Sequence, residues 1–398
     1  MQHKLSSEAK ALLLSFVIYN ILLPLLTTFT NAYIWRERGD LTSLLIFYIP
    51  AFCIIPVAFI IDGWLLKKIP IKWLFGLGII LLAMGNFILV FWKEIDNTAL
   101  IITGLIWGLT IGLYWSNRNI LTQQSTNDSN RNYFAGLETS LQIIISLIVP
   151  ILIGYFIELT NKYGIISYEQ SYKLLIGIAL FGAIIGALFI VKSNFTDYTP
   201  RKIWLRSVST RWNKLRFVSF LMGITSGIST VFPSYLVLTM IGKEGSLGFM
   251  DSISALFGAV FIYFIGKKIT AEKRHMIFYL SLFIEMAGMF VFYFFWGNIG
   301  AAIYVLFTKI RASVSWIGIN SLIMKFVDKE SHSEDKYAYV FDREIFLNIG
   351  RLLSLIIFIP MLNTPLITGL TPFILLLTLL MLVFIEHFVN KTKGKMLQ

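Results

Sequence analysis

The sequence has 398 residues, of which 57% are hydrophobic and 14% are charged, and its formal net charge is +12. Soluble domains are usually about 45–50% apolar with about 25% charged residues, so this composition excludes a water-soluble protein and predicts one embedded in lipid. Apolar stretches recur along the whole chain, which indicates many membrane crossings. The excess of Lys and Arg is typical of membrane topology and of contact with anionic headgroups, and we expect no nucleic-acid partner.

Catalytic and cofactor-binding patterns are missing from the sequence. It contains no HExxH, GxSxG or P-loop motif, so we expect neither an enzyme nor a bound cofactor. The single cysteine, Cys53, lies in an apolar stretch and cannot form an internal disulfide or a cysteine-based metal site. The histidines fall near membrane edges or in polar segments, which does not suit a clustered metal site. They are His3, His275, His332 and His387.

Twelve apolar segments are long enough to cross a membrane, because a helix needs about 20 apolar residues to span the hydrocarbon core. The first begins near Ala9 and lacks a small-residue cleavage site, so we expect a retained helix rather than a signal peptide. The fold class is therefore an all-α integral membrane protein of twelve transmembrane helices. The predicted spans are 9–34, 41–64, 73–92, 98–117, 134–157, 170–191, 216–240, 246–266, 275–296, 299–323, 342–361 and 368–389.

The distribution of Lys and Arg orients these helices. Of the 34 such residues, 25 lie on the side that holds the N-terminus, the even-numbered connections and the C-terminus, and six lie on the other side. The remaining three are at membrane depth. The positive-inside rule then places both termini in the cytoplasm. We expect a multi-pass protein of the cell inner (plasma) membrane.

A long basic connection, 193–215, divides the chain into an N-terminal six-helix bundle, 1–192, and a C-terminal six-helix bundle, 216–398. Thr199 and Pro200 are a favourable N-cap and first helical residue. The connection is therefore predicted to form a helix in the cytoplasmic membrane interface; the alternative is a solvated basic linker. The apolar face of the predicted helix consists of Trp204, Val208, Trp212 and Leu215.

Two six-helix halves, cytoplasmic termini and a basic central loop resemble the major facilitator superfamily. That family carries a Gly-x-x-x-Asp-Arg/Lys-x-Gly-x-Arg/Lys motif after helix 2, and this chain has GWLLKKIPIK at that place. Lys67 replaces the acid and Pro70 the second glycine, while Asp62, just before the motif, would supply a displaced carboxylate. The matching positions are Gly63, Lys68 and Lys72.

The second half repeats features of the first. Its equivalent loop, GKKITAEKR from Gly266, follows about 200 residues later, as an internal duplication predicts. The resemblance implies a secondary transporter that works by alternating access, with helices 10 and 11 lining a central cavity and helix 9 peripheral. Glycines at every fourth position of helix 4 predict close helix packing rather than a phosphate-binding loop. They are Gly104, Gly108 and Gly112.

Four charged residues of the second half lie at membrane depth, where an unpaired charge is costly and marks a functional position. They are Glu285 in helix 9, Lys309 and Arg311 in helix 10, and Arg351 in helix 11. Lys309 and Arg311 lie about 200° apart around their helix, so one faces the pathway while the other pairs with Glu285. Two interpretations stay open: the cations attract an anionic group on the solute, or all four charges form one buried structural network.

Polar and aromatic residues complete the predicted cavity. The first half would contribute uncharged side chains, and its tryptophan would stack on a ring or fill space. Isolated polar residues of membrane helices often bond instead to their own backbone or to a neighbouring helix. The predicted substrate-binding residues are Lys309, Arg311, Arg351, Asn348, Trp316, Asn20, Trp107, Gln142 and Ser226.

An ion gradient is the expected source of energy, because the sequence shows no nucleotide site. The coupling ion is predicted to be the proton, and Glu285 or Asp251 would carry it or form a buried ion pair. At the cytoplasmic helix ends, salt bridges between the halves would hold an outward-open state, by analogy with the family. The residues of this predicted gate are Asp62, Lys67, Lys68, Arg118, Glu138, Asp342, Arg343 and Glu344.

The favoured function is a secondary active transporter, a symporter or antiporter, of a small organic anion, acting as a monomer in the lipid bilayer. An exporter of multiple drugs or lipid-like amphiphiles with the same fold is the alternative, and cationic drugs would require an unpaired acid facing the cavity. A polytopic membrane enzyme is a remote third possibility, since it would require a catalytic cluster that the sequence does not show.

Overall fold

The structure, a computed structural model, describes residues 5–126, 131–268, 275–330 and 336–394. Seven helices precede the central connection, with α1 and α2 forming one crossing. They are α1 (Ser7–Leu26), α2 (Thr28–Arg38), α3 (Leu41–Leu65), α4 (Ile71–Phe91), α5 (Asn97–Ser125), α6 (Arg131–Lys162) and α7 (Tyr168–Lys192). The helices that follow are α8 (Thr210–Met240), α9 (Glu244–Lys268), α10 (His275–Phe294), α11 (Asn298–Glu330), α12 (Lys336–Phe358), the short 3-10 helix η2 (Ile359–Met361) and α13 (Leu366–Gly394).

Each of the twelve predicted spans coincides with one helical crossing of the described chain. Within the residues that the structure describes, ten of these crossings contain a stretch long and apolar enough to qualify as a membrane span by length and hydropathy alone. The other two are α9 and α11. Helix α11 carries Lys309 and Arg311 near its middle, and these charges lower its mean hydropathy. The prediction of an all-α, twelve-helix membrane protein is confirmed.

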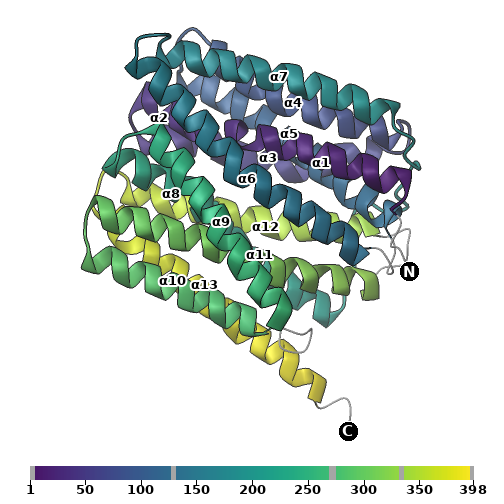
Figure 1. Cartoon of the computed structure of the whole chain (residues 1–398). Coiled ribbons are helices and arrows are strands. Elements are labelled where there is room, and N and C mark those ends of the chain that lie inside the picture. Colours follow the sequence, from purple (N-terminus) through teal and green to yellow (C-terminus); the bar gives the residue numbers. More distant parts are fainter. Residues whose placement is uncertain (1–4, 127–130, 269–274, 331–335, 395–398) are drawn as a thin grey trace.

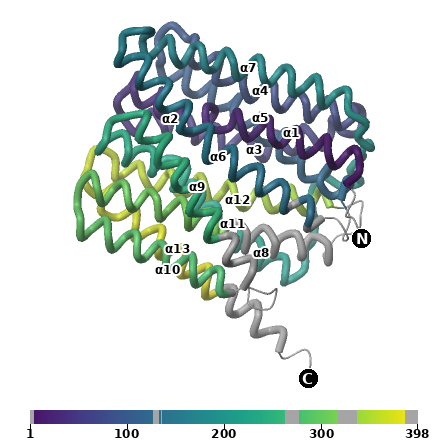
Figure 2. Tube along the Cα trace, in the orientation of Figure 1, coloured from purple at the N-terminus to yellow at the C-terminus, as the bar shows by residue number. Residues whose placement is uncertain are grey.

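The two bundles lie one above the other in Figure 1, where the N-terminal bundle is purple to teal and the C-terminal bundle is green to yellow. Helix α6 packs against α9, and α3 packs against α12, across the boundary between them. Figure 2 shows the same path of the chain, and in Figure 1 α1 begins and α13 ends toward the same end of the helices. We call this the inner end, following the predicted orientation, and the opposite one the outer end.

Short polar residues begin several helices. The side chains of Asp40, Asp96 and Ser209 accept backbone N–H groups in the first turns of α3, α5 and α8, at 2.7, 2.7 and 3.1 Å. Such N-caps satisfy donors that have no partner within the helix. These three helices therefore start where the chain supplies a capping side chain: α3 at the predicted residue, α5 one residue earlier and α8 six residues earlier than predicted.

The first crossing bends between α1 and α2. Pro24 lies within the last turn of α1 and has no N–H to donate, and the helix breaks at Thr27. The indole N–H of Trp107 in α5 donates to the carbonyl oxygen of Leu26 at 3.0 Å, so the break is hydrogen-bonded inside the bundle. Helix α2 is consequently a separate short helix of 11 residues that begins after this break.

Close packing of α3 on α5 depends on the glycines of α5, as predicted. A Cβ atom placed on Gly104 would lie 2.2 Å from the carbonyl oxygen of Phe47, and one on Gly108 would lie 2.1 Å from that of Ala51. On Gly112 it would meet the Ala58 side chain. No larger residue fits at this crossing unless the two backbones separate.

The predicted interfacial helix in the central connection is wrong. Residues 193–209 form no helix, and α8 begins only at Thr210. The segment instead packs against the inner end: Ile203 is buried and, like Tyr337, lies against Gly63. The carboxylate of Asp197 accepts the backbone N–H of Ile71 at 3.3 Å, at the start of α4. Of the predicted apolar face, Trp212 and Leu215 are buried as part of α8, whereas Trp204 is exposed.

Candidate functional site

Glu285 and Arg311 form a buried ion pair within the C-terminal bundle. Arg311 Nε lies 3.2 Å from Glu285 Oε2, and the two side chains are 3% and 0% exposed. The hydroxyl of Tyr304 donates to Glu285 Oε1 at 2.8 Å, and Arg311 Nη2 donates to Ser229 Oγ at 3.0 Å. Arg311 is thus the cation that pairs with Glu285. Hydrogen bonds on both partners are what a buried ion pair requires.

Lys309 forms a different ion pair, with Asp251 of α9, and these side chains are 25% and 14% exposed. Asp251 Oδ2 also accepts the hydroxyl of Thr28 at 2.8 Å. Thr28 belongs to α2, so this hydrogen bond crosses between the bundles. The spacing of the two cations predicted one partner for Glu285; it did not predict that Asp251 holds the other cation.

Arg351 lies on α12 about midway along its span, and its guanidinium faces the N-terminal bundle. It donates to Ser226 Oγ at 3.3 Å and to Asn348 Oδ1 at 3.1 Å. Its Cζ lies 5.3 Å from the ring centroid of Phe52 in α3. In the part of the chain that the structure describes, no carboxylate forms an ion pair with Arg351. Arg351 is therefore a membrane-depth cation without an ion pair in the described residues; Glu344, earlier on the same helix, acts on its charge without forming one.

Glycines hold α8 and α12 close together beside Arg351. A Cβ atom on Gly223 would lie 2.0 Å from the Leu347 carbonyl oxygen, and one on Gly350 would lie 2.0 Å from that of Phe220. Gly227 is equally confined. The Gly-x-x-x-Gly pattern of Gly223 and Gly227 is a known signal for close helix association in membranes, and it was not among the predicted packing glycines.

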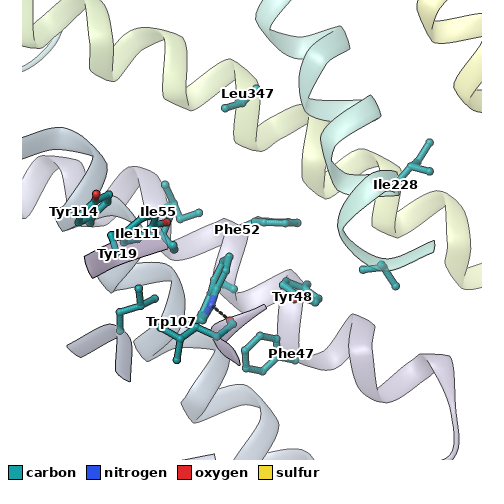
Figure 3. Close-up of a cluster of buried hydrophobic side chains, with 14 of the residues drawn as sticks. Tyr19, Phe47, Tyr48, Phe52, Ile55, Trp107, Ile111, Tyr114, Ile228 and Leu347 are labelled. Atoms are coloured by element: carbon teal, nitrogen blue, oxygen red, sulfur yellow. Dashed lines mark hydrogen bonds between the residues drawn. The ribbon is translucent and has the colours of Figure 1, made fainter. Parts of the chain in front are cut away.

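Aromatic rings of the N-terminal bundle form a cluster (Figure 3), and one of them, Phe52, is the ring that Arg351 contacts. Tyr19 stacks on Tyr114 with ring centroids 3.9 Å apart, and Tyr48 meets Trp107 edge to face at 5.6 Å. Figure 3 places Phe52 between this cluster and Leu347 of α12. The predicted binding residue Trp107 is buried inside the bundle, where its N–H bonds to α1, so its observed contacts are structural.

The remaining predicted binding residues do not converge on one point. The side-chain amide of Asn20 donates to the carbonyl oxygen of Phe16 in its own helix at 2.7 Å. Gln142 is exposed and forms no hydrogen bond in the described part of the chain. The side chain of Trp316 lies outside the described residues. Of the predicted set, Ser226 and Asn348 are the two that contact Arg351.

At the inner end, the ion pairs of the predicted gate lie within single bundles. Arg118 pairs with Glu138 in the N-terminal bundle. Asp342 pairs with Arg216 at 2.6 Å in the C-terminal bundle. Arg343 contacts the adjacent Glu344 at 3.2 Å, while Lys67 and Lys68 are exposed and form no ion pair in the described residues. Salt bridges between the halves therefore stay a prediction for another conformation.

A tyrosine joins the bundles at this inner end. The hydroxyl of Tyr337 in α12 lies 2.6 Å from the carbonyl oxygen of Phe59 and 3.1 Å from Asp62 Oδ2. Asp62 is fully buried and also accepts Ser116 Oγ and Asn117 Nδ2, each at 2.7 Å. Its carboxylate thus receives donors from both bundles.

At the outer end, α2 joins the N-terminal bundle to α8 and α9. Asn31 Nδ2 donates to the carbonyl oxygen of Thr230 at 3.0 Å and to Ser234 Oγ at 3.3 Å. Arg36 Nε donates to Glu244 Oε1 at 2.7 Å. Arg36 falls between the predicted spans 9–34 and 41–64 and Glu244 just before 246–266, so neither was expected at a site. No local pattern marks this pair, because its members are 208 residues apart.

Comparison with known proteins gives a consistent result. Residues 11–334 match the model of the Major Facilitator Superfamily. The chain is 25% identical over 347 residues to an uncharacterized protein, YqgE, of Bacillus subtilis, covering 86% of this chain and 80% of that one. An uncharacterized protein of Geobacillus stearothermophilus, from the sodM 3′ region, is 28% identical over 157 residues, or 39% of this chain and 73% of that one.

Solved structures share the fold at low sequence identity. The chain superposes on the nucleoside transporter NupG with a TM-score of 0.64 at 16% identity, covering 96% of this chain and 100% of that one. For the transporter FucP the TM-score is 0.65 at 16% identity, covering 96% and 99%. For a bacterial ferroportin homologue in its inward-facing state it is 0.69 at 11% identity, covering 96% and 98%.

Proposed function

Because the chain belongs to the Major Facilitator Superfamily, we propose that it is a secondary transporter that carries a small organic anion by alternating access. It acts as a monomer in the plasma membrane with both termini in the cytoplasm. Arg351 carries this proposal. It lies between the bundles, and its contacts there are with two uncharged polar groups and one aromatic ring.

The physical argument rests on the cost of an unneutralised charge. An arginine at the centre of a membrane helix costs about 2.5–3.5 kcal/mol on insertion scales, and a structural arginine would be paired, as Arg311 is with Glu285. A guanidinium presents several N–H donors in a fixed plane that matches a carboxylate or phosphate. The anionic group of the solute would be the missing partner of Arg351.

The test is uptake and counterflow in liposomes, with anionic, neutral and cationic compounds screened on the parent protein. Arg351→Gln should lower transport of the anionic compounds at least about tenfold, and Arg351→Lys should restore only part of it, since a lysine lacks the planar fork. Arg38→Gln is the control for lost positive charge, because Arg38 bonds within the N-terminal bundle. Anion transport that survives Arg351→Gln unchanged would refute the proposal.

Proton coupling is the second part of the proposal, and Asp251 is the residue that we assign to it. Asp251 is partly exposed and contacts both bundles, whereas Glu285 is enclosed by Arg311, Tyr304 and Thr308. A proton that crosses with the solute gains about 2.3 kcal/mol per 100 mV of membrane potential. In Asp251→Asn, a pH gradient should no longer drive accumulation while solute exchange continues. Full pH-driven accumulation in this variant would exclude Asp251 as the carrier.

The same screen addresses export of cationic drugs. Such a function requires an acid that faces the pathway without a cation beside it. Asp251, Glu285 and Asp342 each pair with a basic residue. Asp62 has no basic partner in the described residues, but it is fully buried at the inner end and its carboxylate is occupied by three hydrogen-bond donors. This arrangement favours anions over cations. Counterflow of cationic amphiphiles in the absence of any anion flux would favour the drug exporter over the anion transporter.

A further inference from the structure

The ion pair of Lys309 and Asp251 differs from the other ion pair of the same helix in how it is held. The partners of Arg311 are Glu285 and Ser229, which both belong to the C-terminal bundle. Asp251, in contrast, accepts a hydrogen bond from Thr28 of the other bundle. Any motion that separates the bundles at the outer end therefore leaves the Arg311 pair intact and removes one of the contacts of Asp251.

Helix α2 is the segment through which this separation would act. It follows the break at Thr27 and bonds the C-terminal bundle at three levels. We call these the outer contacts: Thr28 with Asp251, Asn31 with Thr230 and Ser234, and Arg36 with Glu244. The described conformation is consequently one in which the outer ends are joined and the Lys309 charge is neutralised at the same time.

We propose that Lys309 is a second anion-binding residue that Asp251 masks in this conformation, and that the solute releases the outer contact at Thr28 by displacing Asp251. This inference rests on the proposed function, since it takes an organic anion as the solute. The carboxylate of Asp251 and an incoming anion compete for the ammonium of Lys309, so binding of one weakens binding of the other. A solute that binds the freed Lys309 thus favours conformations in which Asp251 is no longer held.

Thermodynamic linkage makes the proposal quantitative. Two events that compete for one group must weaken each other by the same factor. Removing the Thr28 hydroxyl loosens the hold on Asp251 and should therefore increase the population of outer-open molecules and the affinity for external anion together. Loss of one hydrogen bond corresponds to an increase on the order of fivefold both in the outer-open population and in the affinity for external anion.

Two substitutions separate this role from a structural one. Thr28→Val should raise the outer-open population and raise anion affinity. Lys309→Gln should also raise the outer-open population, because Asp251 loses its cation, but should lower anion affinity. The matched control is Thr27→Val, since the neighbouring Thr27 hydroxyl donates to the Leu23 carbonyl oxygen of its own helix. It should change neither quantity.

The outer distance can be measured by pulsed electron paramagnetic resonance between spin labels at Lys93→Cys and Asn298→Cys. Both positions are exposed at the outer end, one in each bundle. Replacing the single cysteine, Cys53→Ser, supplies the background. Affinity is measured by equilibrium binding of the anion that the liposome screen identifies.

The outcomes are distinct. Opposite affinity changes in Thr28→Val and Lys309→Gln, with increased outer opening in both, support the proposal. It is overturned if Thr28→Val behaves as Thr27→Val, or if both variants lose affinity in parallel. The distances are recorded without solute, so the link between Thr28 and outer closure is tested even if no anion binds. A failure of anion binding would count against the proposed function instead.

Discussion

Removal of one hydroxyl at the inner end should change the balance between the conformations. Tyr337 donates across the bundle boundary to the carbonyl oxygen of Phe59 and to the carboxylate of Asp62. In Tyr337→Phe the ring stays, and Asp62 keeps its two donors from α5. The variant therefore loses a contact between bundles without leaving a buried charge unsatisfied.

The size of the effect depends on the acceptors that the Tyr337 hydroxyl loses. A hydrogen bond to a charged group contributes about 1.5–3 kcal/mol, and one to a neutral group about 1 kcal/mol. The hydroxyl is shared between one acceptor of each kind, so about 1.5 kcal/mol is a reasonable figure. This stabilisation exists only while the inner ends are joined. Its loss should raise the ratio of inner-open to inner-closed molecules about tenfold.

The assay is the distance between spin labels at Lys10→Cys and Asn213→Cys in the Cys53→Ser background, both at exposed positions of the inner end. Tyr293→Phe is the matched control, because the Tyr293 hydroxyl bonds the Gly369 carbonyl oxygen within the C-terminal bundle. The reasoning is refuted if Tyr337→Phe and Tyr293→Phe give the same distance distribution as the parent protein.

Three further substitutions test outer closure and the stability of the folded protein. Glu244→Gln removes the charge opposite Arg36 at the outer end, and labels across that end should show a severalfold larger outer-open population; an unchanged distribution would mean that the pair does not stabilise closure. Gly108→Ala places a methyl group 2.1 Å from a backbone oxygen of α3, so thermal unfolding in detergent should show a loss of at least about 2 kcal/mol, and an unchanged melting temperature would contradict the packing. Glu285→Gln leaves Arg311 buried without a counter-charge and should cost about 3–5 kcal/mol by the same measurement; a variant as stable as the parent would show that the pair is not needed for folding.

Much of the fold was predictable because it depends on local composition. The twelve crossings follow from the length of apolar stretches, since lipid forces each segment to satisfy its own backbone as a helix. The glycines of α5 predicted a close crossing because only a missing side chain lets two backbones approach. The same reasoning would have found Gly223 and Gly227, which hold α8 against α12.

Helical spacing was misleading in the connection 193–209. Trp212 and Leu215 recur with the neighbouring apolar residues at a helical period, but they belong to the first turns of α8. Ile203 and Phe195 are buried against the folded inner surface. Periodicity describes which residues share a face of a helix if a helix forms. Periodicity does not show whether a helix forms, or whether the apolar residues pack against the protein or against lipid.

The sequence by itself determined which charges enter the membrane: Glu285, Lys309, Arg311 and Arg351 stand out because hydrocarbon penalises them wherever the chain folds. Only the tertiary structure decided how these charges are neutralised. Thr28 and Asp251 are 223 residues apart, and such pairs depend on how the bundles meet. The low dielectric of the membrane makes each pairing consequential. Arg351 is the one of the three cations that forms no ion pair in the described residues, and it is identified only once the partners of Lys309 and Arg311 are known.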